Sequence, residues 1–458
     1  MTTSITPPTT HTEPSPVVET GDGGGFVRER GRWLRGWNPD DPVQWEQGGH
    51  RVARRNLYGS IYAEFLGFCV WALWSVTVPM LPQAGFVLSV DQQFWLIAVP
   101  SLVGAAMRIP YTFTVPIFGG RNWTIISALL LLIPVVGLAW AVSNPQISFT
   151  TLLVVASLAG FGGGNFASSM TNISFFYPER DKGKALGLNA AGGNLGTGLV
   201  QMVVPLVVTA GAGVALNRAG LMFIPLIVIA AFVAWRWMDN LRDVASDPRT
   251  FARAGRHPHT WLISFLYIGT FGSFIGYSGA FPTLLKNEFP QVTLSIAFLG
   301  ALVGALTRPL GGMLADRVGG ARLTMVCFGA LAVGAAGAIL GLHTGSFTVF
   351  FLSFLLLFAA SGVGNGSTYR MIPAVFRTGV TPHKLASARQ AAAGCIGIAG
   401  AIGAVGGFLI PRGFAMSTSL AGSLIPALIV FIGVYLLMGA LTWVLYVRRS
   451  SVFAQEGV

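Results

Sequence analysis

Twelve long apolar segments dominate this sequence, and their length limits what the chain can fold into. A helix needs about 20 apolar residues to cross the hydrocarbon core of a bilayer, and every segment is that long. Charged residues make up only 10% of the 458 residues, against about 25% in soluble proteins. We therefore predict an all-α polytopic membrane protein with twelve transmembrane helices. The expected spans are residues 57–83, 92–118, 123–143, 149–177, 184–210, 219–238, 260–285, 292–315, 321–342, 346–371, 385–410 and 422–447.

Basic residues are distributed unevenly between the loops that join these segments. The two chain ends and every second loop carry most of the cations, whereas the intervening loops hold few, as in the neutral NPQ at residues 144–146. Because cytoplasmic loops are enriched in Lys and Arg, this alternation predicts an even number of spans with both termini in the cytoplasm. The formal charge of +12 therefore orients the protein in a lipid bilayer, and we expect no nucleic-acid partner.

The two halves of the chain repeat each other at a constant spacing of 200 residues. Arg108 matches Arg308, Asn165 matches Asn365, and Gly119-Gly120 match Gly319-Gly320. The longest charged interruption lies near the middle of the chain and separates six spans from six. Two same-sense repeats of six helices resemble the halves of major facilitator superfamily transporters, in which the substrate site lies at the interface between the halves.

A loop motif in the second half adds to this resemblance. Residues 311–322 read GGMLADRVGGAR, and we expect Asp316 and Arg317 to bridge to neighbouring cytoplasmic helix ends and lock one gate state. The matching PIFGGRNW of the first half keeps the glycines and Arg121 but has no acid. The expected domains are a cytoplasmic tail and interfacial segment (1–55), an N-terminal six-helix bundle (56–240), a central cytoplasmic loop (241–259), a C-terminal six-helix bundle (260–447) and a cytoplasmic tail (448–458).

Arg108 and Arg308 are isolated cations inside apolar segments. A lone Arg at such a depth costs about 2.5–3.5 kcal/mol on insertion scales, so it needs a compensating partner or a function. One alternative is snorkelling to the interface, but each Arg lies deeper than the loop glycines that follow it. Another is pairing with a buried acid, for which Glu64 is the candidate. We favour a site in which the two guanidiniums face each other and bind a small monovalent oxyanion through their planar donor forks.

Two glycine-rich stretches also place polar side chains at positions that a bilayer span would bury. They are residues 160–198 and the shorter 362–373. Small residues at this spacing are typical of closely packed membrane helices, and we assign a structural or gating role to Gly163, Gly164, Gly192, Gly193, Gly364 and Gly366. Packing does not explain the five asparagines in these stretches, which are Asn165, Asn172, Asn189, Asn194 and Asn365. We expect some of them to form hydrogen bonds between helices and others to donate amide hydrogens to the anion.

The same stretches resemble a particular family. GGGNFASSMTNISFFYP, KALGLNAAGGNLG and GVGNGSTYRMIP are similar to the paired signatures of the nitrate/nitrite porter (NarK-like) family, and the resemblance covers the chain after about residue 35. It implies a substrate site made of Arg108, Arg308, Asn194, Phe166, Tyr267 and Phe271. We add Asn165 and Asn365 as candidate ligands from their position in the repeat, and we assign no role to Tyr369.

The leading functional hypothesis is alternating-access transport of nitrate and nitrite by antiport, in the inner or plasma membrane of a bacterium. The absence of an acid or histidine at the arginine level favours exchange. Nitrate/proton symport is the alternative, and Glu64 is the residue that would favour it. Transport of another small anion such as formate is a further alternative.

An enzyme or a sensor built on a membrane scaffold is disfavoured by the sequence. It has no nucleotide-binding loop, no His/Cys cluster with metal-ligand spacing and no nucleophile paired with a base. We therefore expect no catalytic residues, no metal and no cofactor, and we expect a monomer. Cys69, Cys327 and Cys395 all fall in apolar segments and are predicted to be small buried residues, neither disulfides nor ligands.

Overall fold

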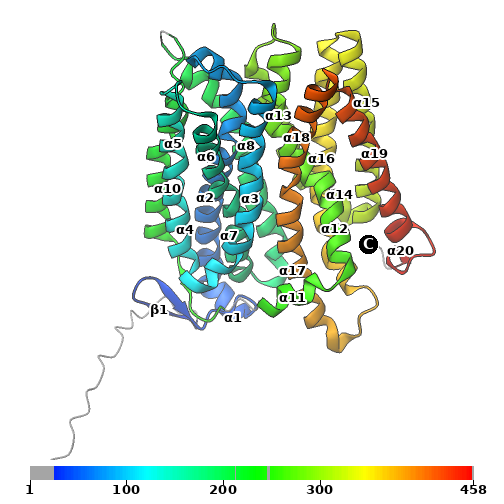
Figure 1. Ribbon diagram of the computed structural model, residues 1–458. Coiled ribbons are helices and arrows are strands. Elements are labelled where there is room, and N and C mark those ends of the chain that lie inside the picture. The colour runs from blue at the N-terminus through cyan, green and yellow to red at the C-terminus, as the bar shows by residue number, and fades with distance from the viewer. Residues whose placement is uncertain (1–24, 212, 245–247, 456–457) are drawn as a thin grey trace, which may run out of the picture.

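The computed structural model describes residues 25–211, 213–244, 248–455 and 458. Within them, twelve helical spans are long and apolar enough to cross a membrane, and they stand side by side as two bundles (Figure 1). Each span overlaps its expected range, so the twelve-span prediction is confirmed. The expected N-terminal tail, at residues 1–24, lies outside the described residues.

Each bundle is built from six spans. The first six are α2 (His50–Thr77), α3 (Val90–Phe118), α4 with α5 (Gly120–Leu130, Leu132–Val142), α6 with α7 (Phe149–Leu158, Gly160–Phe176), α8 (Glu179–Val208) and α9 with α10 (Arg218–Leu221, Phe223–Trp237). The last six are α12 with α13 (Pro258–Tyr267, Ser273–Glu288), α14 (Phe298–Val318), α15 (Gly320–Thr344), α16 (Phe347–Arg377), α17 with α18 (Leu385–Ala404, Gly406–Ala421) and α19 (Ile425–Thr442). Short 3₁₀ or π-helical segments extend or join them at Val78–Ala84, Ile268–Gly272, Leu294–Ile296, Pro382–Lys384 and Trp443–Val447.

The 200-residue repeat is also present in the backbone. α3 ends at Phe118 and α14 at Val318, and each is followed by a glycine with positive φ, 85° at Gly119 and 93° at Gly319. Only glycine adopts this conformation without strain, so the next helix can begin directly at Gly120 or Gly320. The matched glycine pairs are therefore the same tight turn in both bundles.

One helix end differs from its expected position. The eleventh span was expected to end at residue 410 and to leave Arg412 in a loop, but α18 continues through Pro411 to Ala421. The physical reason is that Arg412 Nη1 donates to Asp91 Oδ1 at 2.8 Å, so its charge is balanced against α3 of the other bundle. The loop placement of Arg412 was wrong.

The segment before α2 forms a small sheet. Strand β1 (Val27–Glu29) pairs antiparallel with β2 (Trp33–Arg35), and β2 pairs parallel with β3 (Asn240–Leu241), which follows α10. Next to β3, the carboxylate of Asp239 is fully buried, and ion pairs with three arginines fix the sheet against the bundle. They are Arg28, Arg32 and Arg55. The helical fold class is confirmed, with this three-stranded sheet as an addition.

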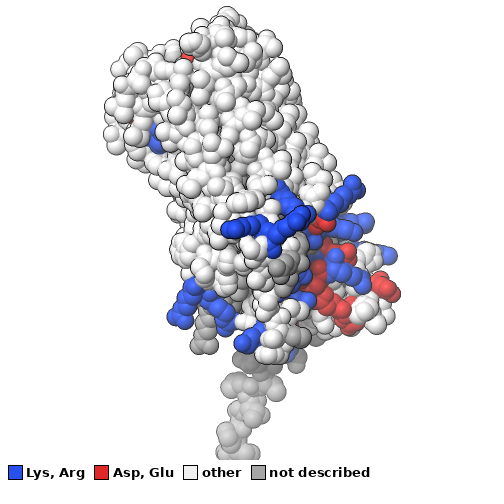
Figure 2. Space-filling view, turned by 90° about the vertical axis from the view of Figure 1, so that its right-hand side faces the viewer, with Lys and Arg blue, Asp and Glu red and all other residues white. Residues whose placement is uncertain are grey.

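Charged side chains gather at one end of the molecule. Figure 2 shows Lys, Arg, Asp and Glu concentrated there, and very few at the other end of the visible face. The charged end carries β1, α1 (Pro42–Gln44) and α11 (Pro248–Gly255), and the short helix α20 (Val452–Gln455) lies towards it (Figure 1). We call these the charged end and the uncharged end.

Several pairs of helices form the interface between the two bundles. α3 contacts α17 and α18, α2 contacts α13, and α8 contacts α14. Arg108 is on α3 and Arg308 is on α14, so both predicted anion ligands belong to helices that form this interface.

Candidate anion-binding site

Arg108 is buried at the middle of the interface, with 1% of its surface exposed. Its Nε donates to the carbonyl of Gly163 at 3.2 Å, and its Nη1 donates to the carbonyl of Gly400 at 2.7 Å. The first bond stays within the N-terminal bundle and the second crosses to α17. Its Nη2 is buried without a hydrogen-bond partner among the described residues. The guanidinium is therefore held in place with one edge still able to donate.

Arg308 approaches the same place from the other bundle. It is 6% exposed, and its Nη1 is buried without a partner in the described part of the chain. The guanidinium carbon lies 5.8 Å from the ring centre of Tyr369. An unpaired N–H on a buried cation is costly, and an anion would satisfy it directly.

Two phenylalanines lie against both arginines. The ring centre of Phe166 is 4.5 Å from the guanidinium carbon of Arg108 and 5.6 Å from that of Arg308, and for Phe271 the distances are 4.9 and 6.0 Å. The rings stack on each other with centres 6.3 Å apart. These contacts are in the range of cation–π attraction, and they bring the two cations together at one aromatic pair.

A local change of helix geometry positions Phe271 beside Tyr267. Residues Ile268–Gly272 form a π-helical turn, and such turns occur frequently at functional sites. The wider turn superimposes the two rings, which stack with centres 5.2 Å apart and planes 18° apart. The Tyr267 hydroxyl then donates to Asn365 Oδ1 at 2.6 Å.

The predicted asparagine ligands are all buried but lie in different surroundings. Asn365 is joined to Tyr267, and its Nδ2 has no partner among the described residues. Asn165 and Asn194 are 2% and 0% exposed, and both atoms of each amide lack a partner within the described chain. Direct contacts thus link Arg108, Arg308, Phe166, Phe271, Tyr267 and Asn365. The amides of Asn165 and Asn194 make no hydrogen bond to either arginine in the described chain.

The predicted structural glycines lie at close helix contacts. A Cβ at any of them would come within 3.0 Å of a neighbouring helix, as at Gly366, where it would be 2.3 Å from the Arg308 carbonyl oxygen. The same holds for Gly163, Gly164, Gly192, Gly193 and Gly364. Gly163, Gly164 and Gly366 lie against the arginine-bearing helices α3 and α14, and the other three lie against α2 or Thr270. Such close contacts agree with a packing role.

Three contributors to the site were not predicted. The indole of Trp71 lies 5.5 Å from the Arg108 guanidinium carbon, and Tyr369 lies against Arg308. The third is the carbonyl of Gly400. Tyr369 follows Asn365 by one helical turn, so the helical period could have indicated it. Trp71 and Gly400 give no such signal, because one is an ordinary apolar residue of a span and the other acts through its backbone.

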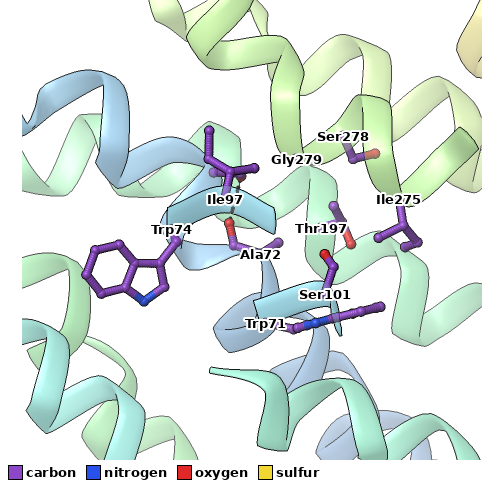
Figure 3. A pocket seen from close by; sticks show the side chains of 10 residues that line it. Trp71, Ala72, Trp74, Ile97, Ser101, Thr197, Ile275, Ser278 and Gly279 are labelled. Carbon is purple, nitrogen blue, oxygen red and sulfur yellow. Dashed lines mark hydrogen bonds between the residues drawn. The ribbon is translucent and has the colours of Figure 1, made fainter. Parts of the chain in front are cut away.

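A small cavity with both apolar and hydroxyl side chains in its wall lies between Trp71 and the uncharged end. It measures about 20 Å³, room for about one water molecule. α2, α3, α8 and α13 line it, and Figure 3 shows Ser101 and Thr197 beside the Trp71 indole, with Ser278 nearby. The hydroxyls of Thr197 and Ser278 are buried without partners among the described residues. Residues of both bundles line this cavity, and one of them, Trp71, also contacts Arg108.

Contacts between α3 and α18 join the bundles towards the uncharged end. Besides the Asp91–Arg412 ion pair, the guanidinium carbon of Arg412 lies 4.1 Å from the Trp95 ring centre, and Trp95 lies 5.8 Å from Phe408. By contrast, Asp316 pairs with Arg370 of α16 within the C-terminal bundle, and both side chains are exposed. Arg317 is also exposed.

The described residues contain no cluster of three or more His, Cys, Asp or Glu side chains able to hold a metal ion. Cys69, Cys327 and Cys395 are buried and free. The side chains that make up the described site are fixed cations, amide and hydroxyl donors, and aromatic rings.

This chain is similar to known membrane transporters in sequence and in fold. The profile of the Major Facilitator Superfamily matches residues 64–404. The nitrate/nitrite transporter NarU of Escherichia coli (strain K12) is 42% identical over 454 residues, covering 92% of this chain and 97% of that protein. The probable nitrate/nitrite antiporter NarK2 of Thermus thermophilus is 35% identical over 451 residues, covering 92% and 98%. The crystal structure of a D-xylose-proton symporter aligns with a TM-score of 0.65 at 16% identity, over 86% of this chain and 97% of that one, which is a likeness of fold.

Proposed function

Because this chain belongs to the major facilitator superfamily and, within it, to the nitrate/nitrite transporter family, we propose that it exchanges nitrate and nitrite across a membrane by alternating access. One observation carries the proposal: two buried arginines, one from each bundle, present unpaired N–H groups beside the same aromatic pair. A small planar anion bound there would satisfy donors from both bundles at once.

The donor set favours a monovalent, flat oxyanion. Two guanidinium forks offer pairs of parallel N–H donors in a plane, and Phe166 and Phe271 limit the height of the space between them. The amides of Asn165, Asn194 and Asn365 add neutral donors. Nitrate and nitrite fit both requirements. Formate is also flat and monovalent and carries two oxygens, as nitrite does, so its competition is a direct test of the selectivity of the site.

The membrane orientation follows from the charges. We place the charged end in the cytoplasm, because Lys and Arg are enriched in cytoplasmic loops, and we place both termini there, in the inner or plasma membrane of a bacterium. The Asp91–Arg412 pair then lies on the outer side of the arginines. Rocking of the two bundles would break it to open the site outwards, and we expect the protein to act as a monomer.

Exchange follows from the unpaired donors of the site. When no anion is bound, a buried N–H group of each arginine lacks an acceptor among the described residues, and this cost disfavours the closed state until an anion binds. The carrier therefore moves readily when loaded with nitrate in one direction and nitrite in the other. This favours antiport over a cycle in which the carrier returns without a bound anion.

A counterflow assay in liposomes tests the proposal. Purified protein is reconstituted into vesicles preloaded with nitrite, with chloride-loaded vesicles as the control and no pH gradient in either. We expect internal nitrite to accelerate nitrate uptake strongly. Uptake that ignores internal nitrite and requires an inward proton gradient would instead establish nitrate/proton symport, and equal inhibition by formate would overturn the selectivity.

A further inference from the structure

Glu64 is a buried acid that the anion site does not use directly. It lies on α2 with 0% of its surface exposed, and the only other buried acid among the described residues is Asp239 at the charged end. Its Oε2 accepts from Asn189 Nδ2 at 2.6 Å, and its Oε1 has no partner in the described chain. Burying a half-satisfied carboxylate is costly, so this position needs an explanation.

The surroundings leave room for this carboxyl group and for little else. At Gly193 of α8, a Cβ would come within 2.2 Å of Glu64 Oε1, so any larger residue there would displace the acid. Asn189 Nδ2 is also 2.5 Å from Ser169 Oγ of α7. The acid is therefore enclosed between three helices of the N-terminal bundle.

The charged groups that interact with Glu64 are the two arginines of the anion site. Glu64 lies one helical turn before Phe68 on α2, and the ring of Phe68 lies 6.2 Å from that of Phe166, which contacts both guanidiniums. Arg308 from α14 and Arg108 from α3 are therefore close enough to act on the acid electrostatically. The side chains of α7 and α8 that contact it, Ser169 and Asn189, are neutral. The phenols at the arginine level, Tyr267 and Tyr369, interact with the arginines. Glu64 thus shares its counter-charges with any bound anion.

We propose, building on the proposed anion site, that Glu64 is a proton-binding site linked to anion occupancy. When nitrate or nitrite binds between the arginines, its charge repels the carboxylate and Glu64 takes a proton from water. When the anion leaves, the proton leaves with it and the carboxylate again balances one arginine. The site then carries one net positive charge in both forms, because each anion that enters is matched by one proton.

Asn189 can stabilise both forms of the acid. Its Nδ2 now donates to the carboxyl group, and its Oδ1 has no partner among the described residues. Rotation of the amide by half a turn would present Oδ1 as an acceptor for a protonated Glu64, since an amide offers a donor and an acceptor at equivalent positions. A single side chain can therefore serve the ionised and the neutral acid without other movement.

The linkage has a defined consequence for transport. In nitrate/nitrite exchange each anion is accompanied by a proton, the two proton movements cancel, and no pH gradient is needed. Net entry of nitrate alone would carry a proton inwards. The same site thus accounts for exchange that ignores a pH gradient and for proton movement when only one anion is present.

Nitrate binding to the purified full-length protein tests the proposal by isothermal titration calorimetry. In the wild type we expect affinity to fall as pH rises, by up to about tenfold per unit once Glu64 ionises, and the binding heat to vary with the ionisation enthalpy of the buffer because protons are taken up. Glu64→Gln should bind nitrate with an affinity and a heat that no longer depend on pH or buffer. The exposed Glu179→Gln is the matched control and should keep the wild-type dependence.

The outcomes separate this proposal from the proposed function. Wild-type binding that depends on neither pH nor buffer overturns the proton site without any variant and leaves the anion site intact. A pH dependence that persists in Glu64→Gln also overturns it. If the wild type binds no nitrate at any pH, the proposed function fails instead.

Discussion

The two bundles carry the same arginine and asparagine 200 residues apart, yet each bundle bonds a different member of the pair. In the N-terminal bundle Arg108 is held by two carbonyls, and the amide of Asn165 has no partner among the described residues. In the C-terminal bundle Asn365 is held by Tyr267, and Arg308 keeps an unpaired N–H. A repeat therefore supplies two copies of one donor set, and local differences decide which donors remain free for a ligand.

The difference arises at the position that holds Tyr267 in the C-terminal bundle. Residue 67, which corresponds to Tyr267, is a glycine, and a Cβ there would come within 2.9 Å of Asn165 Nδ2 and 2.8 Å of the Gly162 carbonyl oxygen. α2 and α7 approach too closely for a side chain, so no phenol can bond Asn165. In the other bundle a tyrosine occupies the equivalent position and bonds Asn365.

A second contrast lies at the charged end. In the N-terminal bundle Asp239 is fully buried and paired with three arginines, whereas in the C-terminal bundle Asp316 and Arg370 are about half exposed. Water screens an exposed pair strongly and a buried cluster weakly. The stability of the N-terminal bundle should therefore depend on the Asp239 ion pairs far more than that of the C-terminal bundle depends on the Asp316–Arg370 pair.

The largest expected effect comes from replacing either arginine by lysine. Arg108→Lys and Arg308→Lys should each lower nitrate exchange about 100-fold, because lost hydrogen bonds to a charged group cost about 1.5–3 kcal/mol and lysine has no planar fork. Counterflow in liposomes measures this, with the exposed Arg322→Lys as the matched control. Near-normal exchange by either site variant would remove that arginine from the anion site.

The next largest effect is on stability. Asp239→Asn keeps the shape of the side chain but leaves three arginines without their shared anion, and we expect a loss of about 2 kcal/mol. This is less than for a fully buried pair, since the arginines are partly solvated. Thermal unfolding in detergent should show a clear fall in Tm, and Asp243→Asn, an exposed acid of the same segment, should show almost none. Equal Tm values for the two variants would contradict the contrast between the bundles.

A smaller effect is expected from Tyr267→Phe. The change removes the donor to Asn365 Oδ1 and leaves that oxygen buried and unpaired, at a cost of about 1 kcal/mol. The amide is then free to rotate, and we expect the nitrate concentration for half-maximal exchange to rise about fivefold. Tyr277→Phe, on the same span as Tyr267, is the matched control, because its hydroxyl bonds that of Tyr435 on α19 and not a residue of the anion site. An equal change in both variants would indicate general damage and not a role at the site.

Much of this fold could be predicted because a membrane span is identified by length and apolarity alone. The repeat could also be predicted, since the paired glycines are required by the same turn conformation. The sheet could not, because two- and three-residue strands have no periodicity and β3 is more than 200 residues from β2. The helical position of Arg412 could not be predicted either, because its partner Asp91 is distant in sequence.

The site was predictable to the extent that its residues are anomalous in a bilayer. Arg108 and Arg308 attract notice because a buried cation needs a reason. The carbonyl of Gly400 and the indole of Trp71 could not be identified, since a backbone acceptor leaves no trace in the sequence and a tryptophan is ordinary in a span. The contacts that hold Arg108, and the lack of a partner among the described residues for one N–H of Arg308, depend on the tertiary structure and could not be predicted from the sequence.

The smallest expected effect is at the exposed ion pair of the C-terminal bundle. Asp316→Asn should change Tm and the exchange rate only slightly, less than about twofold in rate, because an exposed pair contributes about 0.2–1 kcal/mol. The loop motif nevertheless predicts that Asp316 locks a gate state, and a lock would act on the rate of conformational exchange even where its contribution to stability is small. Counterflow rates and Tm measured on the same variant separate these views. A rate change well above twofold with an unchanged Tm would show that the exposed pair controls the gate. The difference in burial between Asp239 and Asp316 would then predict their effects on stability but not on the rate.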